Sequence, residues 1–130
     1  MTAEDLEDLF SPLGHVTIRR FFSGRGIMLD GVTFAFEIRG EVFLKAEGDG
    51  AAALQAAGSR QFTYDRAGRR VSIGFWALPE AAHEDPDELR RWALPALDLA
   101  RRRAAAKAQK SGISRRSKPN AAPRPKVSRQ

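Results

Sequence analysis

Short turn signals between β-type segments constrain this chain most. Asp30-Gly31 separates two runs rich in β-branched and aromatic residues, Arg39-Gly40 separates the second run from a third, and Gly68 lies between two later runs. Asp-Gly favours type I′ hairpins, and connections this short join only antiparallel neighbours. The chain is therefore expected to contain a mainly antiparallel, twisted sheet.

Alternation of apolar and polar residues places the strands. In the clearest case, Val32, Phe34, Phe36 and Ile38 are expected on one face of their strand. Ser23-Gly24-Arg25-Gly26 is expected to break the preceding region with a bulge or tight turn. The predicted strands cover residues 16–22, 27–29, 32–38, 41–46, 61–65 and 70–76.

Two helices are expected around these strands. Residues 2–10 have an N-cap candidate in Thr2 and a capping-box partner in Asp5. Residues 50–57 are rich in alanine, follow Asp49 as N-cap candidate and precede Gly58, the residue type that ends helices.

A third helix is expected to begin after Asp85, because Asp85-Pro86 combines a good N-cap with a proline at the first helical position. Pro95 lies inside the helical pattern and is expected to bend it. The helix should then continue to about Ala106. The order is helix, three or four strands, helix, two strands, helix, which is an α+β fold.

Charge divides the chain into two parts. Residues 1–100 hold 11 Lys and Arg against 16 Asp and Glu, a formal charge of −5, whereas residues 101–130 hold 11 Lys and Arg and no acid. Few large apolar residues follow Lys107, so burial cannot offset the entropy cost of ordering there. We therefore expect a domain over residues 1–106 and a basic, disordered tail over 107–130.

Two interpretations of the basic end stay open. Clustered cations attract nucleic acid through counterion release, without sequence specificity and with a steep salt dependence. The same residues could equally form a solubilising extension. The candidate nucleic-acid-binding residues are Arg101, Arg102, Arg103, Lys107, Lys110, Arg115, Arg116, Lys118, Arg124, Lys126 and Arg129.

Other functional signals are few. The chain has no cysteine and two histidines, His15 and His83, without ligands or catalytic partners at a recognisable spacing. Gly24-Arg25-Gly26 is no phosphate loop, because a strand pattern and not a helix follows it. No catalytic, cofactor-binding or metal-binding residues are predicted. The N-terminus lacks a signal-peptide pattern and no apolar run is long enough to span a membrane, so a cytoplasmic protein without membrane contact is expected.

Arg19, Arg20 and Arg25 form a local basic cluster in an acidic region. They could be solvated residues paired with Glu37 or Glu41, or a docking patch for an acidic partner. Strand alternation places Arg19 and Arg20 on opposite faces. Trp76 is the aromatic residue most expected to lie at an interface.

Several segments together resemble the N-terminal domain of the TfoX/Sxy family: LFSPLGHVTIRRFFSGRGIMLDGVTFAF, then VFLKA, FTY, FWALPE and DPDELRRWALPAL. The resemblance covers about residues 5–103. It implies an α-β(3)-α-β(2)-α fold and a role in regulating natural competence together with a cyclic-AMP-responsive activator. Longer members add a helical C-terminal domain, where this chain has a basic tail.

These observations predict a non-enzymatic regulatory domain. It would contact a protein partner, with a transcription activator as the candidate, while its tail tethers it to nucleic acid. The alternative is a non-specific DNA or RNA binder that works mainly through the tail. No cofactor is expected, and the sequence predicts no oligomeric state.

Overall fold

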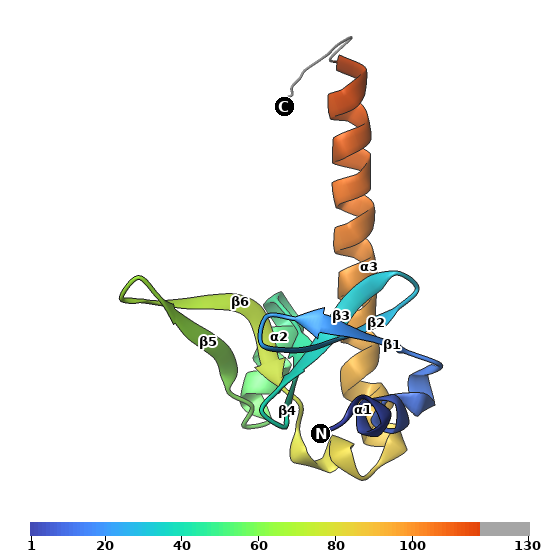
Figure 1. Ribbon diagram of the computed structural model, residues 1–130, viewed down its shortest axis with the longest axis vertical. Helices are drawn as coiled ribbons and strands as arrows, with labels where there is room; N and C mark the ends of the chain where they lie inside the picture. The colour runs from blue at the N-terminus through green and yellow to red at the C-terminus, as the bar shows by residue number, and fades with distance from the viewer. Residues whose placement is uncertain (118–130) are drawn as a thin grey trace. The chain divides into compact units, whose positions relative to one another are not determined.

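The computed structural model describes residues 1–117 and confirms the α+β fold (Figure 1). Four strands precede the second helix and two follow it, which is the upper of the two expected counts. The elements are α1 (Ala3–Leu9), the 3-10 turn η1 (Ser11–Leu13), β1 (Thr17–Phe21), β2 (Gly24–Leu29), β3 (Val32–Ile38), β4 (Glu41–Lys45), α2 (Gly48–Ala56), β5 (Gln61–Arg66), β6 (Arg69–Ala77), the 3-10 turn η2 (Glu80–His83) and α3 (Pro86–Ser117).

The six strands form one antiparallel sheet in the order β1-β2-β3-β4-β6-β5. The β2–β3 turn has positive φ at both Asp30 and Gly31, 54° and 80°, as a type I′ turn requires. The Arg39-Gly40 turn shows the same pattern, with φ of 53° and 83°. Both turn predictions are confirmed. The strand order leaves β1 and β5 at the two edges of the sheet.

Two hydrophobic cores lie on opposite faces of this sheet. The first core joins α1, β2–β4 and the first turns of α3, with Phe10, Phe34 and Leu89 among its fully buried members. The capping box of α1 is present as predicted, because the Thr2 side chain accepts from the Asp5 N–H and the Thr2 N–H donates to the Asp5 carboxylate. Because the members of the first core include residues of α1 and α3, helices cover this face of the sheet.

The second core consists of residues on strands. Phe36, Phe43 and Phe75 are buried at its centre, and Phe21 on β1 and Phe62 on β5 pack around them. The ring centroids of Phe21 and Phe75 are 6.1 Å apart. Phe22, which follows β1, and Tyr64 on the other outermost strand, β5, have ring centroids 5.9 Å apart. Aromatic packing therefore brings the two edges of the sheet toward each other.

The predicted alternation in β3 is wrong at one point. Ile27 pairs with Ala35 and Met28 with Thr33, so Phe34 has no partner on β2 and forms a bulge. Phe34 and Ala35 both belong to the first core, whereas Phe36 belongs to the second. The predicted common face for Phe34 and Phe36 is therefore incorrect.

The second helix begins earlier than predicted. Its N-cap is Glu47, without a side-chain hydrogen bond, and Asp49 lies in the first turn, where a carboxylate interacts favourably with the helix dipole. The predicted N-cap role of Asp49 is wrong. Gly58 ends the helix as expected, with φ of 90° and a hydrogen bond from the Ser59 N–H to the Leu54 carbonyl.

The third helix begins as predicted, since the Asp87 N–H donates to the Asp85 carboxylate at 2.9 Å. The helix passes Pro95 without interruption and ends at Ser117. The predicted end near Ala106 is wrong, because Ala104–Lys110 are mostly strong helix formers and the next proline is Pro119. No helix within residues 1–117 is both long and apolar enough to cross a membrane.

Two compact units share α3. The first unit ends at Ala100 and contains the whole sheet, and the second begins at Arg101. The part of the predicted disordered tail from 118 to 130 lies outside the described residues. The assignment of residues 107–130 to a separate tail stays a prediction.

Candidate functional site

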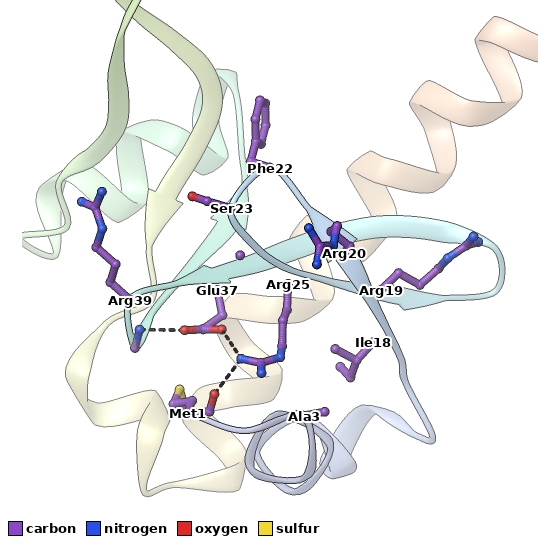
Figure 2. A pocket seen from close by; sticks show the side chains of 12 residues that line it. Met1, Ala3, Ile18, Arg19, Arg20, Phe22, Ser23, Arg25, Glu37 and Arg39 are labelled. Atoms are coloured by element: carbon purple, nitrogen blue, oxygen red, sulfur yellow. Dashed lines mark hydrogen bonds and ion pairs between the residues drawn. The ribbon is translucent and has the colours of Figure 1, made fainter.

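A pocket of about 770 Å³ opens beside the first β-hairpin of the sheet (Figure 2). The start of α1, β1, the β1–β2 turn and the neighbouring ends of β2 and β3 surround it. Four arginines and one glutamate are the charged side chains in its lining. The lining residues are Met1, Ala3, Ile18, Arg19, Arg20, Phe22, Ser23, Gly24, Arg25, Glu37, Arg39 and Gly40.

Glu37 is the buried charged group of this pocket, with 3% of its surface exposed. Its carboxylate accepts from Arg25 Nη1 at 3.3 Å and from the Gly40 N–H at 2.6 Å. The same Arg25 nitrogen donates to the Met1 carbonyl at 2.8 Å. The sequence named Glu37 and Glu41 as candidate partners of the arginines. Arg25 pairs with Glu37, whereas Glu41 pairs with Arg60.

The Arg25–Glu37 pair depends on a close approach of two backbones. A Cβ atom at Gly24 would collide with the Glu37 carbonyl oxygen and lie 3.1 Å from the Ile38 Cα. Only glycine fits at this position. The predicted break at residues 23–26 is therefore shorter than expected: the turn comprises Phe22 and Ser23, and Gly24 begins β2. The glycine-rich segment Gly24-Arg25-Gly26 lies in strand β2 and does not precede a helix. It therefore lacks the strand–loop–helix context that a phosphate loop requires.

The other three arginines of the pocket lack an acidic partner. Within residues 1–117, no ion pair involves Arg19, Arg20 or Arg39. All three are exposed. In Figure 2 the Arg25 guanidinium points at Glu37 and Met1, whereas Arg39 points away from this pair. The pocket therefore carries a surplus of positive charge on a unit whose formal charge is −5.

Phe22 lies at the rim of this pocket in an unfavourable position for an apolar residue. It is 57% exposed, and its φ of 54° lies in the left-handed region that side chains other than glycine, asparagine and aspartate seldom adopt. Its ring contacts Phe21, with centroids 4.8 Å apart, and Tyr64 at 5.9 Å. An exposed aromatic ring next to arginines has the composition of a protein-binding hot spot.

The structure brings together three of the four predicted docking residues. Arg19, Arg20 and Arg25 line the pocket, and Arg19 and Arg20 point to opposite faces of β1 as expected. Trp76 is half-buried on β6, opposite Leu44, and does not line it. Sequence reasoning missed Arg39 and Phe22. The Arg39-Gly40 turn signal was visible, but its proximity to Arg25 depends on the pairing of β2 with β3.

Part of the basic segment is also described. Arg101, Arg102, Arg103 and Lys107 are exposed on the helical backbone of the second unit. For Lys110, Arg115 and Arg116 the structure describes the helical backbone alone. Lys118, Arg124, Lys126 and Arg129 lie outside the described residues. Their role in nucleic-acid binding stays a prediction.

Among the described residues, no group of three or more His, Asp or Glu side chains is arranged to hold a metal ion. His15 is exposed and His83 half-buried. Neither of them lines the arginine pocket.

The fold and the pocket together define a small α+β domain with one antiparallel sheet and a basic surface site. The family model described as "TfoX N-terminal domain" matches residues 8–100, and the chain belongs to this family. The resemblance seen in the sequence is thereby confirmed. No curated protein matches the chain.

Proposed function

We propose that this chain is a non-enzymatic regulatory domain of the competence type, which acts in the cytoplasm on transcription through contact with a protein partner. The observation that carries this proposal is the family match over residues 8–100. The arginine pocket supports it, because arginine and exposed aromatic residues are enriched where proteins bind each other. A transcription activator is the candidate partner.

Deletion of the gene in its host tests this proposal. Transcripts of DNA-uptake genes and the transformation frequency should both fall, and the full chain supplied in trans should restore them. A deletion that changes neither quantity would contradict the competence role.

We also propose that the basic segment holds the protein on nucleic acid. Eleven cations without any acid follow Ala100, and cations that neutralise phosphates release counterions. Binding through six to ten phosphates predicts a loss in affinity of roughly 10³–10⁵ between 50 and 200 mM salt.

A gel-shift series with the full chain measures this salt dependence. The decisive variant replaces the eight Lys and Arg residues after Ala106 with glutamine, which keeps chain length and helix propensity. Its matched control neutralises Arg66, Arg69 and Arg70 in the β5–β6 hairpin. Tail binding predicts a large loss for the first variant and little change for the second. Equal binding by wild type and the tail variant would refute the tether.

If the tail variant retains every regulatory effect in the host, protein contact is sufficient. If regulation is absent but wild type binds DNA and RNA alike, the alternative of a non-specific nucleic-acid binder is favoured instead.

A further inference from the structure

The edge strand β1 leaves part of its backbone without a partner strand. Within the described residues β1 pairs with β2 alone, and Phe21 lies opposite Gly24 across the two-residue turn. The pair that flanks such a turn is hydrogen-bonded, and hydrogen-bonded pairs alternate along the ladder. The N–H and C=O groups of Ile18 and Arg20 therefore face the open edge. Both residues also line the arginine pocket.

The cross-strand register shows which arginine beside this edge has an acidic neighbour and which does not. Arg20 lies opposite Arg25, and Arg25 lies opposite Glu37. Glu37 and the Met1 carbonyl satisfy Arg25, so the single carboxylate of this row is already used. Like charges directly opposite each other on a sheet are destabilising. A further carboxylate next to Arg20 would relieve this repulsion.

Charge and backbone chemistry together decide which occupant fits the edge. Antiparallel pairing of two copies of β1 about Arg19 or Arg20 would place that arginine opposite its own counterpart and bring the other arginine close to it, which disfavours a homodimer. Charge alone does not separate an acidic polypeptide from nucleic acid here, because both are attracted to the arginines beside this edge. However, the alternating donors and acceptors of a strand edge match a polypeptide backbone rather than a sugar-phosphate backbone.

We propose that β1 binds an extended, acidic segment of a partner protein as an additional strand of the sheet. Main-chain hydrogen bonds to Ile18 and Arg20 supply affinity, and carboxylates on the two faces of the added strand pair with Arg20 and Arg19. The exposed ring of Phe22 receives an apolar side chain at the end of the segment. This inference rests on the proposed function, in which the domain works by protein contact.

Amide hydrogen exchange of the full chain, followed by NMR, tests strand addition at single residues. The probe is a synthetic peptide in which pairs of adjacent glutamates alternate with pairs of valines, so that an added strand carries carboxylates on both faces. The control peptide has lysine in place of glutamate. At about ten times its Kd, the glutamate peptide should slow exchange of the Ile18 and Arg20 amides about tenfold. The amides of β5, the other sheet edge, should not change. This readout is independent of any peptide bound by the basic segment.

Two variants and one chemical change sharpen this test. Arg20→Glu should abolish the protection, whereas Arg66→Glu, an equal charge reversal on the exposed edge strand β5, should leave it intact. Peptides N-methylated at alternate residues separate strand addition from charge attraction, because methyl groups on the edge that faces β1 should prevent protection and those on the opposite edge should not. Circular dichroism verifies that both protein variants are folded.

Several results would overturn the proposal: no protection at Ile18 and Arg20, equal protection by the lysine peptide, or equal protection by both methylated forms. Protection of the same amides by single-stranded oligodeoxythymidine would instead identify nucleic acid as the occupant. If protection fails while Arg20→Glu still restores DNA-uptake transcripts in the deletion host, the regulatory function holds and acts through another surface.

Discussion

At the scale of single residues, Gly24 controls the geometry of the arginine pocket. The sequence predicted that glycine here serves a bend, and the turn signal was correctly located to within two residues. The actual requirement is the close approach of β2 to the Glu37 backbone. That requirement could not be predicted, because it arises only once β2 and β3 are paired in their observed register.

Gly24→Ala is therefore expected to destabilise the protein strongly. The added methyl group meets backbone atoms of β3, which cannot rotate away, so the free energy of unfolding should fall by about 1–3 kcal/mol or more. Urea denaturation measures the change. Gly50→Ala in α2 is the matched control, because its Cβ would meet only the Ala46 Cβ at 4.0 Å and alanine favours helix. Equal stability of the two variants would show that the backbones are not in close contact.

At the scale of elements, local signals predicted the hairpin turns, two of the three helix starts and the end of α2, but not the faces of β3 or the end of α3. The capping box of α1 and the Asp85 N-cap of α3 depend on residues within one turn, and both are confirmed. The bulge at Phe34 and the continuation of α3 to Ser117 were missed. The bulge leaves no local composition signal, and the basic composition after Lys107 concealed a helix propensity that alanine and lysine still provide.

The capping box predicts a pH dependence of α1. The Thr2 backbone N–H, which donates to the Asp5 carboxylate, and then the Thr2 hydroxyl hold the pKa of Asp5 below its ordinary value of 3.8. A lowered pKa in the folded state means that ionised Asp5 stabilises the helix fully above pH 3.8. This contribution is lost as the pH falls through the lower, folded-state pKa.

NMR titration of the Asp5 carboxyl carbon measures this pKa directly. Thr2→Ala removes the side-chain contribution but keeps the backbone donor, so it should return the pKa only part of the way. In Asp5→Asn, fraying of the first turn, measured by amide exchange, should no longer depend on the ionisation of residue 5 as the pH falls below 3.8. A midpoint for Asp5 at or above 3.8 in the wild type would contradict the capping box.

At the scale of the first unit, the sheet carries one core on each face, and helices contribute to only one of these cores. The first core includes helices from both ends of the unit. The β5–β6 hairpin joins the sheet through three register pairs between β4 and β6 and through the aromatic second core. Alternation in the sequence places Val42 and Leu44 on one side of β4 and Phe43 on the other. It could not show that the two sheet edges share one core, since that depends on the twist of the complete sheet.

We expect the two cores to unfold as one cooperative transition, because β3 and β4 contribute buried residues to both of them. Phe34→Ala in the first core and Phe36→Ala in the second should each lower the free energy of unfolding by about 3–5 kcal/mol. Each change should also shift the whole transition and not one part of it.

Two single-tryptophan variants report on the two sides separately: Trp76→Phe leaves Trp92, which packs against the first core, and Trp92→Phe leaves Trp76 on β6. Coincident urea transitions of the two tryptophans, before and after Phe36→Ala, are the expected result. If Trp76 reported unfolding of Phe36→Ala at a lower urea concentration than Trp92, the β5–β6 hairpin would be a separate unit of stability held to the sheet by its aromatic contacts.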